Sequence, residues 1–296
     1  MRENKVVYGL IGYGGMGRWH TEILSNVPEA VIGGIYDIKE EKREEAKEKG
    51  FSVYETEEAM LADPEIDVVL IATPNDCHKP IAIRAMHAGK NVISEKPVTL
   101  SSADLLEMEN AAKETGKLLT VHQNRRWDDD FLIIKKLVEE QKLGHVFRIE
   151  SRVHGSRGIP GDWRKEKVHG GGMVLDWGVH LLDQILYMYG DRKLETVYAS
   201  LTNITNQEVD DGFTAILTFE GGTEVLVEVG TNNYISLPRW YVLGEDGTAV
   251  IRDWQLNGEI IRKTGKTEET VVPVKTAAGL TKTMAPRRED TIVKED

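Results

Sequence analysis

The 296-residue sequence has a single cysteine and no long hydrophobic run. Cys77 alone cannot form an internal disulfide or a zinc site of several cysteines, which indicates a reducing compartment. The strongly apolar stretches, such as Val68 to Ala72, are far shorter than the roughly 20 residues that a membrane-spanning helix needs. The sequence therefore predicts no membrane span and a fold that packing must stabilise.

Basic side chains are in the minority, with 37 lysines and arginines against 49 aspartates and glutamates, so the net charge is −12. This balance argues against nucleic acid and against an anionic membrane as partners. The N-terminal segment has an apolar run broken by glycines and no small-residue cleavage site, which predicts a cytoplasmic protein. With 40% hydrophobic and 29% charged residues, the composition is that of a globular protein.

Two different patterns divide the chain. Up to about Val121, short apolar runs alternate with helical stretches, as a parallel sheet with crossover helices requires. The second half instead has segments typical of antiparallel strands, predicted at 145–153, 195–204, 212–219, 223–230, 239–244 and 248–252. We therefore predict an α/β protein with an N-terminal doubly wound Rossmann domain over 1–122. A C-terminal α+β domain on a mostly antiparallel sheet follows over 123–296, and the cleft between them is the expected ligand site.

A glycine motif follows the first predicted strand directly. Gly12, Gly14 and Gly17 form G-x-G-x-x-G before a helical stretch, and Gly15 opens the loop further. In that context the glycines allow a tight turn, a close approach of a pyrophosphate to the backbone, and close packing of helix and strand. The alternative is a glycine-rich turn without a ligand.

Asp37 ends the second predicted strand, about 20 positions after Gly17. A carboxylate there can accept hydrogen bonds from a ribose diol and would repel a 2′-phosphate. We therefore expect NAD as the cofactor. NADP is the second option, because Lys39 and Lys42 lie nearby.

Lys96 lies at the end of another predicted strand, in the string SEKPVTLS. Ligands bind at this edge of an open α/β sheet, so Lys96 is a candidate functional residue. A lysine before Pro97 could equally be a surface residue in an extended turn. The segment TPNDCH, from Thr73 to His78, leaves a neighbouring strand in the same way.

Asp176 and His180 are four positions apart in GGGMVLDWGVHLLD, so they share one face of a predicted helix from Asp176 to Tyr189. Such a pair can supply a proton acceptor and the carboxylate that orients it. The alternative is a capping aspartate beside a structural histidine. No metal is expected, because no third ligand is signalled by spacing and hydride transfer to nicotinamide requires none.

The motifs GYGGMG, TPNDCH, EKP, QNRRW, DWR and GGGMVLDWGVH, in this order and with Asp37 between the first two, resemble the Gfo/Idh/MocA oxidoreductase family. The resemblance covers nearly the whole chain, and HQNRRWDDDF followed by LIIKKL is most similar to scyllo-inositol dehydrogenase-type members. It implies that Lys96, Asp176 and His180 form the catalytic group. His180 would take the hydroxyl proton, Lys96 would stabilise charge on the reacting oxygen, and Asp176 would orient the substrate.

The resemblance also assigns the cofactor loops. The implied cofactor-binding residues are Gly12, Gly14, Gly15, Met16, Gly17, Asp37, Thr73, Pro74, Asn75, His78, Glu95 and Lys96. Nearer the nicotinamide end and the domain junction, the implied residues are Asn124, Trp163 and Arg164.

The expected function is hydride transfer between NAD(P) and a hydroxyl-bearing carbon of a cyclitol, sugar or sugar derivative, by a homodimer or homotetramer. The alternatives are a non-catalytic dinucleotide-binding regulator and an enzyme that recycles tightly bound NAD. Family members usually continue past the position of Asp296, so the resemblance also suggests a shortened C-terminal end.

Overall fold

The computed structural model describes residues 4–265, 274–277, 279–281 and 292–295. Two compact units make up the chain. The first contains 1–124, 159–179 and 206–210, and the second contains 125–158, 180–205 and 211–296. The division into domains at 122 and 123 stays a prediction. Most of the polar segment on which the shortened C-terminal end was predicted lies outside the described residues.

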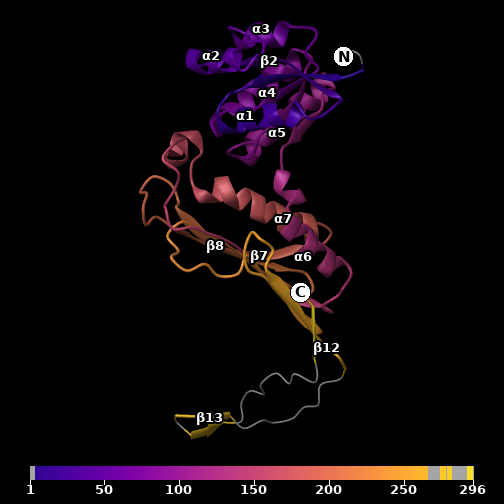
Figure 1. The fold of residues 1–296 in the computed structure, drawn as a ribbon, viewed down its shortest axis with the longest axis vertical. Coiled ribbons are helices and arrows are strands. Elements are labelled where there is room, and N and C mark those ends of the chain that lie inside the picture. The colour runs from indigo at the N-terminus through magenta and orange to yellow at the C-terminus, as the bar shows by residue number, and fades with distance from the viewer. Residues whose placement is uncertain (1–3, 266–273, 278, 282–291, 296) are drawn as a thin grey trace. The chain divides into compact units, whose positions relative to one another are not determined.

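The first unit is built on five parallel strands in the order β2-β1-β3-β4-β5. Figure 1 labels β2 and the five helices of this unit. The strands are β1 (Val6–Ile11), β2 (Ala30–Tyr36), β3 (Val68–Ile71), β4 (Asn91–Ser94) and β5 (Leu119–Val121). The helices are α1 (Gly15–Leu24), α2 (Glu40–Glu48), α3 (Glu57–Ala62), α4 (His78–His87) and α5 (Ser102–Thr115). This confirms the predicted doubly wound sheet, although the six-residue helix α3 was not predicted.

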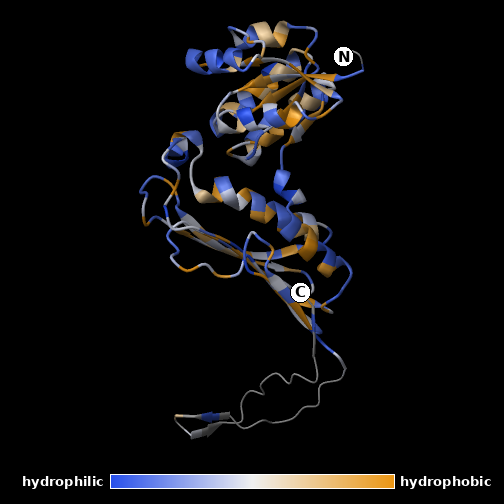
Figure 2. Cartoon of the chain, viewed as in Figure 1, coloured by the Kyte–Doolittle hydropathy of each residue, from blue (hydrophilic) through white to orange (hydrophobic). Residues whose placement is uncertain are grey.

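Both faces of this parallel sheet are buried. On β1, Val7 and Ile11 belong to one apolar cluster and Leu10 to the other, as the two-residue period of a strand requires. Figure 2 shows these strands in hydrophobic colours, whereas α2 is hydrophilic along its length. The sheet is therefore a rigid frame, and the loops that leave its carboxyl edge are held at one end by a packed core.

The second unit contains an eight-stranded sheet in the order β15-β12-β11-β10-β6-β9-β8-β7. Its strands are β6 (Val146–His154), β7 (Leu194–Thr202), β8 (Gly212–Phe219), β9 (Glu224–Gly230), β10 (Trp240–Gly244), β11 (Gly247–Ile251), β12 (Gly258–Lys263) and β15 (Ile292–Glu295). All neighbours are antiparallel except β6 and β9. This confirms the mostly antiparallel sheet, and the hairpin β13 (Val274–Thr276) and β14 (Gly279–Thr281) stands apart from it.

Two helices of the second unit, α6 (Asp129–Glu139) and α7 (Val179–Tyr189), supply aromatic contacts to this sheet. Phe131 of α6 lies 6.3 Å from the ring of Trp240, and Tyr189 of α7 stacks on Phe219 at 5.2 Å. Within the described residues, no helix combines the length and the apolar character that crossing a membrane requires.

The predicted single helix from Asp176 to Tyr189 is wrong at its start. Residues Val174–Gly178 form a π-helical turn, and α7 begins only at Val179. The four-residue spacing therefore does not place Asp176 and His180 on one face of an α-helix. Wider turns of this kind occur often at functional sites.

Candidate functional site

The glycine loop joins β1 to α1 and presents bare backbone. Gly12 has a φ of +97°, and a Cβ there would lie 2.5 Å from the carbonyl oxygen of Ala72. A Cβ on Gly17 would lie 2.1 Å from the Gly12 carbonyl oxygen, so this glycine allows the close packing of helix and strand. A Cβ on Gly14 or Gly15 would meet nothing within 4 Å, and Gly14 is the N-cap residue of α1, which has no side-chain cap. This helix start fits a pyrophosphate, which would accept hydrogen bonds from its N–H groups. Met16 in its first turn is partly exposed.

Asp37 closes the same loop from the end of β2. Its carboxylate accepts hydrogen bonds from the backbone N–H of Tyr13 at 2.6 Å and of Lys39 at 2.9 Å. Both oxygens retain a lone pair for a ribose diol. The loop and the carboxylate therefore fit the adenosine end of a dinucleotide, as predicted from their spacing.

Two basic side chains of this unit, on α1 and α2, are tied to one glutamate. Arg18 and Lys42 both donate to the Glu45 carboxylate at 2.7 Å. Hydrogen bonds from Lys42 and Arg18 lower the pKa of Glu45 to about 2. Glu45 therefore holds two cations that would otherwise be free to bind a 2′-phosphate.

The loop after β3 contains Thr73, Pro74, Asn75 and His78. The Asn75 amide donates to the carbonyl oxygen of Gly170 at 2.8 Å, and the Thr73 hydroxyl donates to the Pro74 carbonyl oxygen. His78 is fully buried, with its ring nitrogens 2.8 Å and 3.0 Å from the carbonyl oxygens of Pro97 and Thr73. Burial lowers the pKa of His78, although both carbonyl contacts oppose this. His78 therefore supports the loops from inside the unit.

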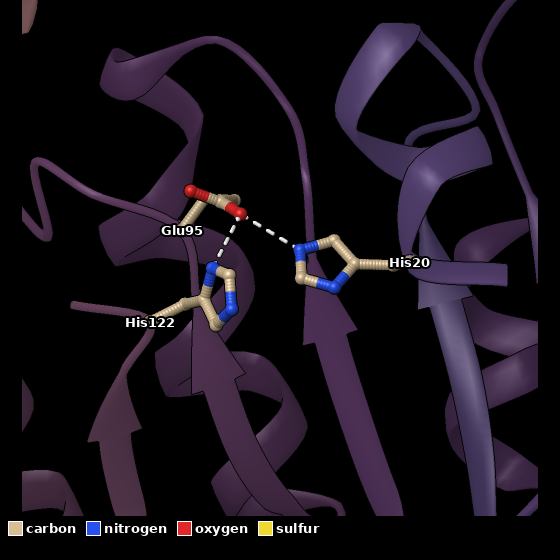
Figure 3. Close-up of side chains that lie close together, drawn as sticks. All are labelled: His20, Glu95 and His122. Atoms are coloured by element: carbon tan, nitrogen blue, oxygen red, sulfur yellow. Dashed lines mark hydrogen bonds and ion pairs between the residues drawn. The ribbon is translucent and has the colours of Figure 1, made fainter. Parts of the chain in front are cut away.

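Glu95 follows β4 and is bonded by two histidines (Figure 3). Its Oε1 lies 2.7 Å from His20 Nε2 and 3.0 Å from His122 Nδ1. Burial raises the pKa of Glu95, but the hydrogen bonds from the two histidines outweigh it and bring this pKa far below its usual value. Glu95 is thus an ionised, buried group.

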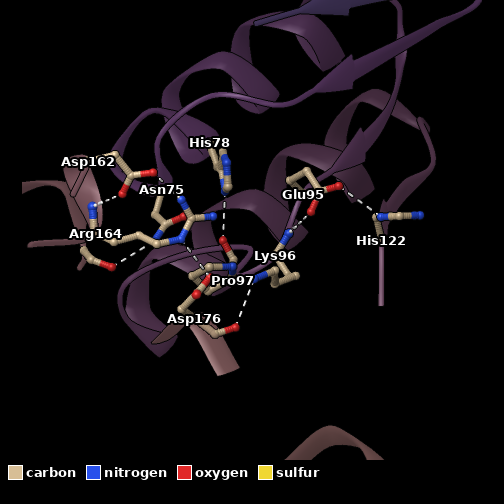
Figure 4. Close-up of polar contacts among 10 residues, drawn as sticks. Asn75, His78, Glu95, Lys96, Pro97, His122, Asp162, Arg164 and Asp176 are labelled. Atoms are coloured by element: carbon tan, nitrogen blue, oxygen red, sulfur yellow. Dashed lines mark hydrogen bonds and ion pairs between the residues drawn. The ribbon is translucent and has the colours of Figure 1, made fainter. Parts of the chain in front are cut away.

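Lys96, the next residue, enters a different cluster (Figure 4). Its Nζ donates to the Asp176 carboxylate at 3.1 Å and to the Asp176 carbonyl oxygen at 3.0 Å. The side chains of both residues are 15% exposed, so this pair is largely desolvated. The structure therefore brings together two of the three predicted catalytic residues.

Arg164 completes this cluster of charges. Its Nε lies 3.2 Å from the Asp176 carboxylate, and its guanidinium also donates to Asp162 at 2.7 Å while stacking on the ring of Trp163. Burial raises the pKa of Asp176, but the charges of Lys96 and Arg164 outweigh it and bring the pKa below its usual value. Asp162 was not predicted, although it begins the DWR motif.

The π-helical turn that carries Asp176 is anchored by Asp210. The backbone N–H of Val174 donates to the Asp210 carboxylate at 2.9 Å, and the N–H of Met173 donates to the Asp210 carbonyl oxygen at 3.1 Å. A Cβ on Gly172 would lie 2.3 Å from the Asp210 carboxylate, so glycine is required there. Sequence reasoning missed Asp210, because nothing in its local pattern connects it to Gly172.

Two further predicted residues remain, His180 and Asn124. His180 is buried in α7 and belongs to the second unit, whereas Lys96 and Asp176 belong to the first. Asn124 begins a 3₁₀ turn, Asn124–Trp127, and is half-buried. Their roles stay predictions.

The comparisons with known proteins give two family matches. Residues 6–123 match the Gfo/Idh/MocA model described as "Oxidoreductase family, NAD-binding Rossmann fold", and residues 131–250 match the Gfo/Idh/MocA C-terminal domain. The cofactor class is therefore a nicotinamide dinucleotide, which the glycine loop and Asp37 fit.

Individual proteins show the same likeness. The uncharacterized oxidoreductase YdgJ of Escherichia coli is 36% identical over 62% of this chain and 53% of its own length. The scyllo-inositol 2-dehydrogenase (NADP(+)) IolW of Bacillus subtilis is 31% identical over 82% of this chain and 67% of its own length. Thus the chain spans about half to two thirds of these relatives. The crystal structure of an NAD-binding protein from Listeria innocua has a TM-score of 0.95 and 52% identity, covering 98% of this chain and 84% of that one.

Proposed function

We propose, from the premise that this chain belongs to the Gfo/Idh/MocA oxidoreductase family, that it oxidises a hydroxyl-bearing carbon of a cyclitol, sugar or sugar derivative. The observation that carries this proposal is the Lys96 ammonium, held by Asp176 at the carboxyl edge of the parallel sheet. Ligands of open α/β sheets bind at that edge. The relative named as a scyllo-inositol dehydrogenase supports a polyol as the substrate class.

Nicotinamide, when bound, supplies the hydride acceptor. Lys96 donates a hydrogen bond to the reacting oxygen and stabilises the negative charge that develops when hydride leaves its carbon. The Asp176 carboxylate and carbonyl oxygen accept two of the three N–H groups of the Lys96 ammonium, which leaves one N–H for the substrate as far as the described residues show. Asp176 therefore orients Lys96.

His180 is proposed as the general base that takes the hydroxyl proton. A neutral imidazole has a pKa suited to proton transfer near neutral pH. Arg164 and Lys96 together balance the charge of the Asp176 carboxylate. With Asp162, the cluster contains two cations and two carboxylates.

We further propose NAD in preference to NADP, because Asp37 faces the ribose position and Glu45 holds Arg18 and Lys42.

The experiment that tests this function is the formation of reduced nicotinamide by the purified chain. It uses NAD and, separately, NADP with a panel of inositols, aldoses, and their acids and phosphates. Turnover with a polyol or sugar is expected. Tight NAD binding without turnover of any compound in the panel would favour the regulator or the enzyme that recycles bound NAD.

We also propose that the chain forms a homodimer or homotetramer through β7. Every residue of β7 is exposed, including Val197, Tyr198 and Leu201. Exposed apolar side chains on an edge strand favour association. Light scattering after size-exclusion chromatography is expected to give at least twice the monomer mass, and a monomer at micromolar concentration would contradict this.

A further inference from the structure

The side chains of His20, Glu95 and His122 lie close together inside the first unit, although they come from three separate segments (Figure 3). His20 lies on α1, Glu95 follows β4, and His122 follows β5. One ligand atom from each residue lies within 4.8 Å of the other two. His20 and Glu95 are buried, and the His122 side chain is 25% exposed.

The donor set is one that binds divalent transition metals. Imidazole nitrogen suits Zn²⁺, Fe²⁺, Co²⁺ and Ni²⁺, and two histidines with one carboxylate leave an open position on the ion. An ion with ligand bonds of about 2.0–2.2 Å separates tetrahedral ligand atoms by about 3.3–3.5 Å. The Glu95 oxygen lies 2.7 Å from the His20 nitrogen and 3.0 Å from the His122 nitrogen. Both distances have to widen for an ion to enter, by roughly half an ångström to just under one.

The surroundings hold the three side chains in place. The second oxygen of Glu95 accepts the backbone N–H of Lys96 at 3.2 Å, which orients the carboxylate. The ring of His20 lies 4.7 Å from that of His122, and the ring of Trp19 packs against both at 5.2 Å and 5.7 Å. Supporting contacts of this kind fix the orientation of metal ligands and raise affinity.

The carboxylate also lies where a cation would need it. Oε1 of Glu95 is 2.7 Å from His20 Nε2 and 3.0 Å from His122 Nδ1, so the three ligand atoms already face one another. A divalent ion would replace both N–H contacts, and each imidazole would then hold its proton on the other ring nitrogen. The basic group next along the chain, the Lys96 ammonium, is already paired with Asp176.

We propose that His20, Glu95 and His122 form a binding site for a divalent transition-metal ion of the Zn²⁺ class. The open coordination position takes water. None of its ligand atoms belongs to the proposed catalytic residues Lys96, Asp176 and His180, although Glu95 is also one of the residues expected to line the cofactor. Metal binding can therefore be measured separately from turnover. It departs from the expectation of no metal, which rested on ligand spacing around Asp176 and on hydride transfer needing no ion.

The test uses Co²⁺ as the probe on the full chain, purified without a histidine tag and stripped with a chelator that is then removed. Visible d–d absorption bands are expected to saturate at one Co²⁺ per chain and to disappear when Zn²⁺ is added. His122→Gln and His20→Gln are expected to weaken Co²⁺ binding by about 100-fold or more, since changing even a supporting residue costs 10–100-fold. His169→Gln is the matched control, because His169 contacts Asp76 at 3.0 Å and Glu166 at 3.5 Å in the same unit.

Circular dichroism establishes that each variant folds. If the variant of buried His20 does not, His122→Gln decides, because that side chain is partly exposed. Absence of Co²⁺ bands in the wild type would overturn the proposal and leave a cluster held by hydrogen bonds alone. Bands that persist in His122→Gln, or that vanish in His169→Gln, would also overturn it.

Discussion

Glu95 and Lys96 are adjacent in the chain, yet their side chains enter two clusters of different character (Figure 4). Lys96 meets Asp176, which Arg164 also contacts, so its partners carry permanent charges near neutral pH. Glu95 meets only the titratable rings of His20 and His122 through Oε1. The loop after β4 therefore supplies a partly exposed cation, Lys96, and a buried anion, Glu95.

This difference suggests a catalytic role for Lys96 and a structural role for Glu95. A group that stabilises charge on a substrate must keep an unused donor and some exposure, as Lys96 does. A group that joins α1 to the loops after β4 and β5 is buried and contacted on both of its carboxylate oxygens, as Glu95 is. We therefore expect substitution of Lys96 to lower turnover and substitution of Glu95 to lower stability.

The largest effect is expected for Lys96→Met. Loss of the ammonium should lower kcat by about 10²–10³-fold, because a donor to the developing oxyanion is removed. The Kd for NAD should change only a few-fold, since the glycine loop and Asp37 are untouched. Steady-state kinetics measure kcat, and quenching of the tryptophan fluorescence of the protein by NAD measures the Kd.

Lys113→Met is the matched control, because this lysine is exposed on α5 and its one ion pair among the described residues is with Glu109, at 3.8 Å. It should leave kcat unchanged. Unaltered turnover in Lys96→Met would remove Lys96 from the mechanism.

Glu95→Gln should act on stability in the first place. The amide keeps one acceptor for the three donors that now contact the carboxylate, so we expect a loss of about 1–3 kcal/mol in the free energy of unfolding. Urea denaturation followed by circular dichroism measures it. Glu109→Gln on the exposed face of α5 should change it by less than about 0.5 kcal/mol. Equal effects of the two substitutions would show that the buried cluster supports nothing.

A smaller change is expected when Asp37 is replaced by serine. Removing the carboxylate should shift the ratio of kcat/KM for NADP over NAD upward by on the order of tenfold, or about 1.4 kcal/mol. Glu45→Gln should shift the ratio in the same direction by less, because it releases Arg18 and Lys42. A ratio that does not move in Asp37→Ser would refute the cofactor preference.

The smallest effect concerns pH. The folded pKa of Asp176 lies below the ordinary value of 3.8, so its ion pairs contribute stability above that pH and lose it as the pH falls toward the folded pKa. The difference in unfolding free energy between the wild type and Asp176→Asn should therefore be constant from pH 7 to about 5 and shrink below about 4. If the difference grows as the pH falls, burial has a larger effect on the pKa of Asp176 than Lys96 and Arg164 have, and the account of this ion pair is wrong.

Much of the fold could be predicted because its signals are local. Strand β1, the glycine turn and α1 follow one another without interruption, and FTAILTF with TEVLVEV alternates as β8 and β9 do. Helix α3 was missed because six residues give too few turns for a periodic pattern. The π-helical turn was missed because its sequence continues the apolar pattern of α7.

The site was predictable only in part, for a related reason. Lys96 and Asp176 are 80 positions apart, and only the family resemblance linked them before the structure did. His20 and Glu95 are 75 positions apart, and no spacing rule joins a histidine on a helix to a carboxylate after a strand. Contacts of this kind depend on the order of strands in the sheet, which local sequence does not encode.

The most direct test of the account follows a labelled hydrogen. The chain is incubated with NAD and with an inositol or sugar on which it shows turnover. This substrate carries deuterium on its hydroxyl-bearing carbons. Mass spectrometry then measures the deuterium in the reduced nicotinamide. The account predicts one deuterium per reduced nicotinamide, formed by the wild type and the Lys113 control and almost absent with Lys96→Met. Reduced nicotinamide without deuterium, or equal transfer by Lys96→Met, would contradict it.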